Sequence, residues 1–314
     1  MKLLIKERLK LEQFKTPILF VVFNREESTK RVFEVIKKVR PINLYISSDG
    51  PREYEEGERE KVARIRDYIA KNISWPCNFR SLFHHSNLGC KNAVTEGIDW
   101  FFENEESGII LEDDCVPNQS FFEYCDELLK LFKSEMRIWH IGGNNYNYPG
   151  KINNSFSIVR FAQVWGWATW ANRWAKYRKD LKPLLKNLDL NDFCESTNLS
   201  IREAREVINR IEKASSGEID TWDYQWQGVV LLNKGLCVVP RNNMITNIGT
   251  GSDATHTKSI NANAHLKIQE SEFPLTYPKE IIPHVDLENY FKKRMGIKLS
   301  RFRSFKRKLR KLIK

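Results

Sequence analysis

A short apolar run near the N-terminus places the tightest limit on the fold of this chain. Residues 16–25 read TPILFVVFNR, a continuous series of β-branched and aromatic side chains that begins beside a proline and ends in polar residues. Such a run is typical of a strand buried on both faces of a sheet. A helical pattern follows over residues 28–39, and Pro41 ends it before a second strand-like run, NLYISS. A strand, a helix and a strand within about 35 residues predict a parallel βαβ unit.

The same alternation continues for roughly 130 residues. Further helices are expected over residues 58–71, 90–104 and 121–132, and further strands over residues 77–83 and 108–114. This order predicts an α/β fold with an open, mostly parallel twisted sheet and helices on both faces. Beyond residue 138 the pattern weakens, and we expect a polar helical stretch over 178–215, a strand over 228–239 and a loop rich in Gly, Thr and Asn over 241–263.

Positive charge is concentrated at the C-terminal end of the chain. The net charge of +11 comes from 51 Lys and Arg against 40 Asp and Glu, but residues 289–314 hold 12 of the basic residues and no acidic ones. The rest of the chain is almost neutral, which disfavours a nucleic-acid-binding surface across the fold, and we expect no nucleic-acid partner.

The basic end of the chain also has an apolar stripe. From Leu299 onward, apolar residues recur every three or four positions with Lys and Arg between them, as on an amphipathic helix. We therefore expect a basic amphipathic tail over residues 286–314 that binds an anionic membrane surface. A solvated tail, or a helix packed on the body, is the alternative.

Other features indicate where such a protein resides. The longest apolar runs fall far short of the ~18 residues that a transmembrane helix needs. Residues 1–15 are interrupted by charges, unlike a signal peptide, and are expected to form a helical extension. Six scattered cysteines without a CxxC pair indicate reduced thiols and no zinc site. We expect a cytoplasmic protein attached peripherally to the inner face of the cell membrane.

Three consecutive carboxylates stand out in the middle of the chain. Glu112, Asp113 and Asp114 follow the buried run GIIL, at the end of an expected strand. Ligands of open α/β sheets bind at that edge. Adjacent carboxylates repel one another, and a divalent cation would offset this cost while bridging the phosphates of a nucleotide. The sequence thus favours a metal site over the alternative, an acidic turn in water.

Several segments together resemble the GT-A fold nucleotide-sugar glycosyltransferases. In chain order they are PILFVVFNR, SSDGPR, NLGCKNAV, ILEDDCVP, VWGWATW, TWDYQW and NIGTGSDATHT. The chain is similar to bacterial transferases often labelled hemolysin-like proteins, and more distantly to N-acetylglucosaminyltransferase I. The resemblance covers roughly residues 16–260. It implies a GT-A domain over 16–285, with a nucleotide-binding part over about 16–135 and an acceptor-binding part over about 136–260.

The resemblance implies a metal-dependent glycosyltransferase. Such an enzyme would move a sugar, with inversion, from a nucleoside-diphosphate sugar, a UDP-sugar being favoured, to a glycan or lipid-linked acceptor in bacterial surface polysaccharide synthesis. Its cofactor would be Mn²⁺ or Mg²⁺. One alternative is a nucleotide-sugar-binding protein without transfer activity. Another is a nucleotidyltransferase, although these enzymes usually have a Gly-rich loop after the first strand, where this chain reads NREE.

The resemblance also implies residues for the metal and for the chemistry. Asp114 would be the main metal ligand and His256 a second one, while Glu112 and Asp113 would hold ribose or metal-bound water. The family motif is commonly DxD, and this chain has EDD instead. Asp223 would be the catalytic base that deprotonates the acceptor hydroxyl. From the residues alone, His256 could equally be a surface histidine, and the TWDYQW segment a helix start with core aromatics.

The remaining implied contacts are with the nucleotide-sugar. Ten residues carry them besides Glu112 and Asp113: Phe23, Asn24 and Arg25 beside the base and ribose, Asp49 as an acceptor from the base, Asn87, Gly89 and Lys91 beside the nucleotide, and Trp165, Gly166 and Trp167 in the pocket wall. The alternative for the Trp-Gly-Trp segment is an ordinary place in the core.

Overall fold

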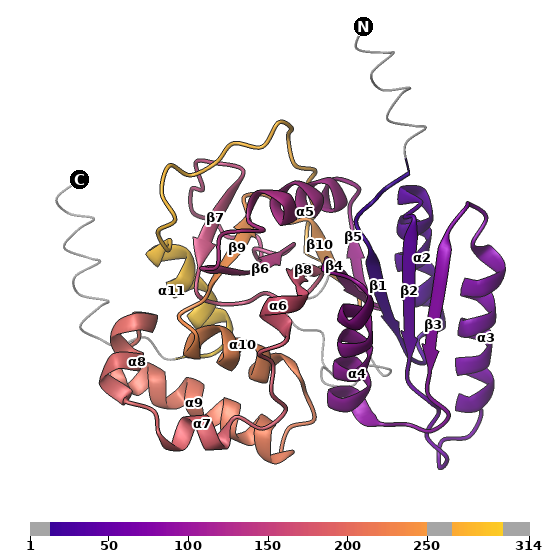
Figure 1. The fold of residues 1–314 in the computed structure, drawn as a ribbon, viewed down its shortest axis with the longest axis horizontal. Coiled ribbons are helices and arrows are strands. Elements are labelled where there is room, and N and C mark those ends of the chain that lie inside the picture. The colour runs from indigo at the N-terminus through magenta and orange to yellow at the C-terminus, as the bar shows by residue number, and fades with distance from the viewer. Residues whose placement is uncertain (1–12, 250–265, 298–314) are drawn as a thin grey trace, which may run out of the picture.

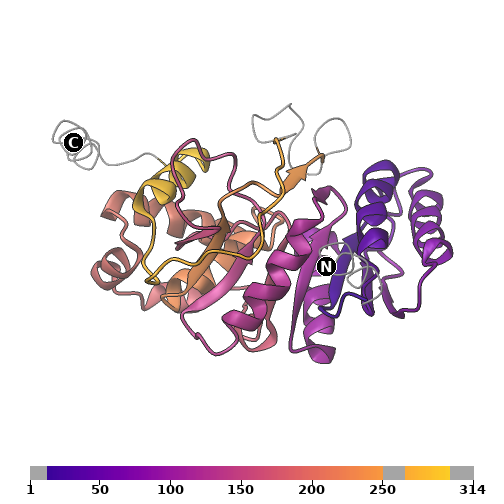
Figure 2. The ribbon, with the colours of Figure 1, turned by 90° about the horizontal axis from the view of Figure 1, so that it is seen from above.

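A computed structural model describes residues 13–249 and 266–297 of the chain. Its main feature is an eight-stranded sheet in the order β3-β2-β1-β4-β8-β6-β9-β7, flanked by helices (Figure 1). Four of the strand pairs are parallel and three are antiparallel. Seen from above in Figure 2, helices lie on both sides of the twisted sheet. The open α/β sheet expected from the sequence is confirmed.

The first half of the sheet follows the alternating pattern closely. Its elements are β1 (Ile18–Val22), α2 (Glu26–Val39), β2 (Asn43–Ser48), α3 (Glu58–Asn72), β3 (Asn78–Phe83), α4 (Gly89–Asn104) and β4 (Ser107–Glu112). All five residues of β1 are buried, because β2 and β4 flank it and helices cover both of its faces. This explains why β1 reads as a continuous apolar run.

The second half has shorter elements and a mixed strand direction. They are β5 (Cys115–Pro117), α5 (Ser120–Leu131), β6 (Ile138–Gly142), β7 (Phe156–Val159), β8 (Trp167–Trp170), α6 (Ala171–Trp174), α7 (Lys182–Lys186), α8 (Leu190–Thr197), α9 (Ile201–Ser216), α10 (Asp223–Leu232), β9 (Leu236–Pro240), β10 (Ile245–Asn247) and α11 (Val285–Arg294). Strand β8 runs antiparallel to both of its neighbours, β4 and β6, and so joins the two halves. β10 pairs with β5 in a separate two-stranded ribbon.

The expected strand over residues 228–239 is wrong in its first part. Residues up to Leu232 belong to α10, and the strand β9 begins only at Leu236. The run GVVLL is apolar without a break because α10 is buried on several sides, and such a run does not distinguish a helix from a strand.

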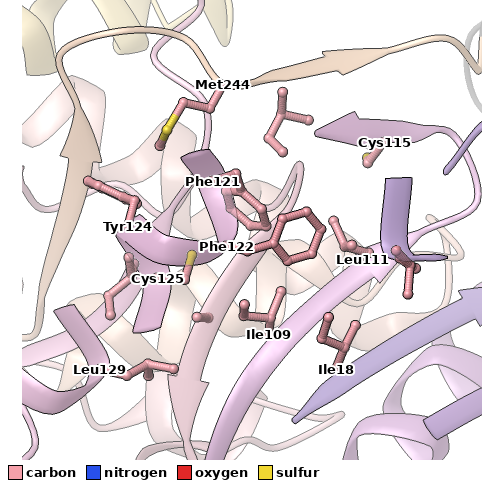
Figure 3. Packing of buried hydrophobic residues seen from close by; sticks show 14 of the residues in the cluster. Ile18, Ile109, Leu111, Cys115, Phe121, Phe122, Tyr124, Cys125, Leu129 and Met244 are labelled. Carbon is pink, nitrogen blue, oxygen red and sulfur yellow. The ribbon is translucent and has the colours of Figure 1, made fainter. Parts of the chain in front are cut away.

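Two apolar clusters cover the two faces of the sheet. On one face, Phe121 and Phe122 of α5 pack over Leu111 of β4, and Met244 closes the cluster from the loop before β10 (Figure 3). On the other face, Trp167 of β8 is fully buried and stacks on Trp222, with ring centroids 5.5 Å apart. The second cluster is therefore built around indole rings.

A histidine is buried inside the indole cluster. The His140 ring stacks on Trp167 at 5.0 Å, and its Nδ1 accepts a hydrogen bond from Trp226 Nε1 at 3.2 Å. Burial lowers the pKa of His140 to about 3. The ring is therefore neutral at physiological pH and serves as a polar member of the core.

Helix α11 packs against the body of the protein. Leu287 and Phe291 are fully buried, and the Glu288 carboxylate forms an ion pair with Arg160 at 3.0 Å. The first part of the expected tail, from residue 286, therefore belongs to the folded body. The expected N-terminal extension, except residues 13–15, and the amphipathic pattern from Leu299 lie outside the described residues.

Two further observations concern the chain as a whole. Among the helices of residues 13–249 and 266–297, none combines the length and the apolar character needed to cross a bilayer. All six cysteines are unpaired, as expected, and three of them are buried: Cys115, Cys125 and Cys237.

Candidate active site

The predicted site residues gather at one edge of the sheet. The strands β1, β2, β4 and β6 run in the same direction, so their carboxyl ends meet at this edge, and the amino end of the antiparallel β8 joins them. Arg25 lies just beyond β1, Asp49 just beyond β2, and Glu112 ends β4. This is the edge at which open α/β sheets bind ligands.

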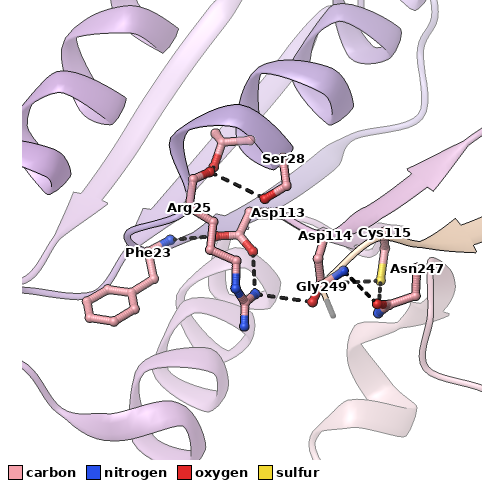
Figure 4. Close-up of polar contacts among 9 residues, drawn as sticks. Phe23, Arg25, Ser28, Asp113, Asp114, Cys115, Asn247 and Gly249 are labelled. Carbon is pink, nitrogen blue, oxygen red and sulfur yellow. Dashed lines mark hydrogen bonds and ion pairs between the residues drawn. The ribbon is translucent and has the colours of Figure 1, made fainter. Parts of the chain in front are cut away.

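Arg25 forms ion pairs with two of the three consecutive carboxylates. Its Nη1 donates to Asp113 Oδ1 at 2.8 Å and to Asp114 Oδ2 at 3.1 Å (Figure 4). The backbone N–H of Phe23 donates to the other Asp113 oxygen at 3.1 Å. Burial opposes the charge on Arg25, but Asp113 and Asp114 outweigh it and raise the pKa of the guanidinium. A side chain of the protein itself thus offsets part of the repulsion for which the sequence suggested a cation.

Glu112 is the carboxylate that lacks such compensation. Its side chain is half-buried, and no hydrogen-bond donor contacts it among residues 13–249 and 266–297. Burial, followed by the charges of Asp114 and Asp113, raises the pKa of Glu112 well above its ordinary value. The negative charge of Asp223 adds to this effect. The end of β4 therefore carries a half-buried carboxyl group that has no hydrogen-bond partner among the residues that the structure describes.

Asp223 approaches the end of β4 from another element. It is the first residue of α10, and its Oδ1 accepts hydrogen bonds from Thr221 Oγ1 and from the backbone N–H of Tyr224. In the described part of the chain, its Oδ2 has no donor. Burial, followed by the charge of Asp223, raises the pKa of Tyr146. Asp223 thus lies within electrostatic reach of Glu112, with one carboxylate oxygen left for a ligand.

The Trp-Gly-Trp segment is divided between the site and the core. The half-buried Trp165 meets the ring of Tyr146 edge-on, with centroids 5.2 Å apart. Gly166 has a φ of +60°, and a Cβ there would lie 2.6 Å from Ile245. Trp167 has no exposed surface and belongs to the indole cluster. Of the two tryptophans, only Trp165 is accessible to a ligand, so Trp167 is a core residue, not part of a pocket wall.

The same division holds for the aromatic residues around Asp223. Trp222 and Trp226 are buried in the core, whereas Tyr224 is half-buried. The TWDYQW segment is therefore a helix start with core indoles, as the alternative had it, and it also presents Asp223 at the sheet edge.

Asp49 and Asn87 bind each other at the far side of the edge. Asp49 Oδ2 accepts a hydrogen bond from Asn87 Nδ2 at 2.8 Å, and Asp49 Oδ1 accepts from the backbone N–H groups of Gly50 and Leu88 at 2.8 and 2.9 Å. Burial raises the pKa of Asp49. These contacts fix the loop between β3 and α4, and Asp49's role as an acceptor from the base remains a prediction.

The start of α4 is tied to the loop that carries Asp223. The carboxylate of Asp220 accepts from the backbone N–H groups of Cys90 and Lys91 at 2.9 and 3.0 Å. Gly89 has a φ of +79°, and a Cβ there would lie 2.9 Å from Asp220. The ammonium of Lys91 donates to the carbonyl of Ala214 at 3.2 Å. Gly89 and Lys91 therefore connect α4 to the end of α9 and the loop before Asp223.

Phe23 and Asn24 lie beside the start of α3 and the loop that precedes it. Asn24 Nδ2 donates to Glu58 at 2.7 Å, and the guanidinium of Arg52 lies 5.7 Å from the centre of the Phe23 ring. In Figure 4 this ring points away from Asp113 and Asp114. Both residues are half-buried, and Phe23 contacts the carboxylates through its backbone N–H, which donates to Asp113.

Several residues at the edge were not predicted from the sequence. Cys90 is one of them: burial raises the pKa of its thiol, as do the charges of Glu112, Asp220 and Asp223. Tyr146 is another, with a φ of +53° in the Asn- and Tyr-rich segment after β6. The crowding of Asn and Tyr at residues 144–148 was the available signal for Tyr146. Asp220 had none, because its role depends on a contact with α4, 130 residues away in the sequence.

The carboxylates at this edge suit a hard divalent cation in their chemistry. Asp114 and Glu112 offer oxygen ligands, and Glu112 has no donor within the described ranges, so the donor set fits Mn²⁺ or Mg²⁺. Within those ranges no three His, Cys, Asp or Glu side chains are already arranged around a common metal position. His256, the other expected ligand, lies outside the described residues.

Comparisons with known proteins find matches among solved structures, all of them distant. No family model and no curated protein matches the sequence. Among solved structures, a mannosyltransferase from Pyrobaculum calidifontis in complex with GDP-Man and Mn²⁺ is 7% identical, with a TM-score of 0.34 over 74% of this chain and 75% of that one.

Two other structures have similar scores. A UDP-glucose pyrophosphorylase without ligand is 9% identical, with a TM-score of 0.33 over 71% of this chain and 90% of that one. Mouse xyloside xylosyltransferase 1 is 9% identical, with a TM-score of 0.33 over 69% and 81%. These neighbours are glycosyltransferases and a nucleotide-sugar pyrophosphorylase. At such scores the likeness carries no conclusion about the activity of this chain.

Proposed function

We propose that this protein is a glycosyltransferase that uses a nucleoside-diphosphate sugar, depends on a divalent cation and inverts the configuration of the transferred sugar. One observation carries the proposal. Two separate acidic groups, Glu112 and Asp114 at the end of β4 and Asp223 at the start of α10, lie at one edge of an α/β sheet. Inverting transfer from a nucleotide-sugar requires such a separation, because the leaving diphosphate and the acceptor hydroxyl then lie on opposite sides of the reacting carbon.

The chain's own residues would divide the work as follows. Asp223 Oδ2 would accept the proton of the acceptor hydroxyl while that oxygen bonds to the anomeric carbon and the bond from this carbon to the diphosphate breaks. Thr221 and the N–H of Tyr224 hold the other oxygen and so fix the carboxylate. Asp114, with Glu112 beside it, would hold the cation, which supplies positive charge near the leaving diphosphate when bound. The rings of Trp165 and Tyr146 would flank a sugar.

The finer assignments are part of the same proposal. The donor is a UDP-sugar, and the acceptor is a glycan or a lipid-linked saccharide of a bacterial surface polysaccharide. Asp49, Asn87 and the residues after β1 would border the nucleotide. A nucleotidyltransferase is less well supported, because the turn after β1 lacks glycine and the first turn of α2 carries Glu26 and Glu27, which would repel a triphosphate.

Donor binding is expected to depend on a divalent cation held by Asp114. A thermal-shift screen of nucleotide-sugars, with Mn²⁺ and with chelator, identifies the donor, because a ligand that binds the native state raises its apparent stability. Calorimetry with the selected donor should then show binding at least about tenfold tighter with Mn²⁺, the scale at which metal-site contacts act. Asp114→Ala should remove this difference.

The matched control is Asp67→Ala, which removes an exposed carboxylate of α3 that pairs with Lys71 and should retain the Mn²⁺ effect. Equal donor affinity with Mn²⁺ and with chelator would contradict the proposal. Release of nucleoside triphosphate with pyrophosphate as co-substrate would favour the nucleotidyltransferase, and donor binding without any hydrolysis or transfer would favour the binding protein.

The basic C-terminal segment is proposed to attach the enzyme to an anionic membrane surface. Each basic residue near such a surface contributes about 1 kcal/mol, and residues 298–314 contain nine of them. Full-length protein should float with anionic liposomes at low salt, and a variant ending at Gly296 should not. Equal flotation of both proteins, or no binding of the full-length protein, would contradict this attachment.

A further inference from the structure

We infer that Arg25 is an internal counter-ion that competes with the divalent cation for Asp114 and releases Asp114 when a nucleoside diphosphate binds. The inference builds on the proposed function, because it concerns how the cation and the donor enter the same site. It assigns to Arg25 a role other than contact with the base and ribose.

The contacts of the two aspartates provide the first step. Each of their four carboxylate oxygens has a donor: Phe23 N–H and Arg25 Nη1 on Asp113, and Arg25 Nη1 and Cys115 Sγ on Asp114. The Cys115 thiol is a weak donor at 3.2 Å. For Asp114 to bind a cation through Oδ2, that oxygen must therefore separate from Arg25.

The second step is the difference between the two ion pairs. The Asp113 side chain is only 5% exposed and is also held by a backbone N–H, whereas those of Asp114 and Arg25 are 14% and 19% exposed. The contact of Arg25 with Asp114, at 3.1 Å, is longer than its contact with Asp113, at 2.8 Å. Arg25 can thus release Asp114 while Asp113 continues to hold it.

The acidic groups at this edge outnumber the positive charge of Arg25. Glu112, Asp113 and Asp114 follow one another at this edge, and Arg25 forms ion pairs with Asp113 and Asp114. A single guanidinium leaves the edge acidic, so a divalent cation is attracted to it. The cation and Arg25 repel each other, however, and this repulsion weakens the site as long as no other anion is present.

A diphosphate relieves this competition. Guanidinium groups bind phosphate oxygens through strong, charge-assisted hydrogen bonds, so an Arg25 that has released Asp114 gains a new partner on the donor. Asp114, once released, would be available to hold the cation. Cation and nucleotide should consequently bind with positive coupling, and this coupling is reciprocal.

The experiment is a titration of the full-length protein with Mn²⁺ alone and then in the presence of UDP, followed by calorimetry. Wild type should bind Mn²⁺ weakly alone and more tightly with UDP. Without UDP, Arg25→Gln should bind Mn²⁺ at least about tenfold more tightly than wild type does. UDP should increase the Mn²⁺ affinity of this variant less than it increases that of wild type.

The matched control is Arg52→Gln, which removes a positive charge beside the Phe23 ring without touching Asp113 or Asp114. If Arg25→Gln binds Mn²⁺ no more tightly than wild type, or if Arg52→Gln tightens binding equally, the inference is overturned. Wild type that fails to bind Mn²⁺ even with UDP would contradict metal-dependent transfer, whereas tight Mn²⁺ binding by Arg25→Gln would still support the counter-ion role.

A second measurement follows Arg25 in the wild-type protein, in which its ion pairs are intact. In wild type labelled with ¹⁵N-arginine, the Arg25 side-chain resonance is assigned by its absence in Arg25→Lys. This resonance should shift when Mg²⁺ and UDP are added together. A resonance that stays in place while both ligands bind would overturn the inference.

Discussion

Replacing Asp223 by asparagine is expected to lower kcat by about 10²–10⁴-fold, the usual contribution of a positioned general base. Asparagine keeps the Oδ1 acceptor that Thr221 and the N–H of Tyr224 contact, so the start of α10 should be preserved. Only the unpartnered oxygen that would take the proton is replaced by an amide. Steady-state rates of nucleoside diphosphate release, with acceptor, measure the loss, and calorimetry should show unchanged donor binding.

Asp286→Asn is the control for this experiment, because Asp286 is exposed on α11 and the same change of charge there should leave kcat within about twofold. A near wild-type rate for Asp223→Asn would mean that the base lies elsewhere. A loss of donor binding together with kcat would instead assign Asp223 to the donor side of the site.

The second large effect concerns stability. Trp167→Ala should lower the free energy of unfolding by about 3–5 kcal/mol, the range for a fully buried tryptophan. Trp167 has no exposed surface and packs against His140 and Trp222, with centroids 5.0 and 5.5 Å away. Its removal leaves a cavity that these rigid rings cannot close. Urea denaturation followed by circular dichroism measures the change.

Trp165→Ala provides the comparison, since the two residues are identical in type and two positions apart. Trp165 is only half-buried, so its removal should cost about half as much or less. Equal losses for the two variants would show that the division of this segment between site and core is incorrect.

The two halves of the fold differ in how far the sequence predicts them. In the first half, β1, β2 and β3 pair in the order in which they follow one another, each joined to the next by one helix, so local patterns and connection lengths suffice to place them. In the second half, β8 inserts between β4 and β6, which are 26 residues apart across α5. No local pattern encodes that insertion, and the four-residue strand is too short to show a period.

The site shows the same contrast. The acidic triplet at the end of β4 can be recognised in the sequence because it follows a buried run. Its ion pairs with Arg25 could not be predicted in the same way, because they depend on β1 and β4 being adjacent in the sheet. A lone basic residue just after the first strand was an available signal, because the central strands of such sheets are neighbours. The buried state of Trp167 and Trp226 was not readable, since indoles serve equally in cores and in sugar sites.

The position of β8 also affects how the chain can be synthesised. Strand β4 emerges from the ribosome with β1 already made, but its other edge is covered only by residues 167–170, more than fifty residues later. During that interval, a buried-type strand has unpaired backbone groups along one side, which is the condition for wrong pairing between chains. In the finished protein, the pairing that closes this edge also brings the Trp165–Gly166 segment beside Tyr146. The nascent chain therefore covers this open edge of β4 in the same step that assembles the part of the site containing Trp165.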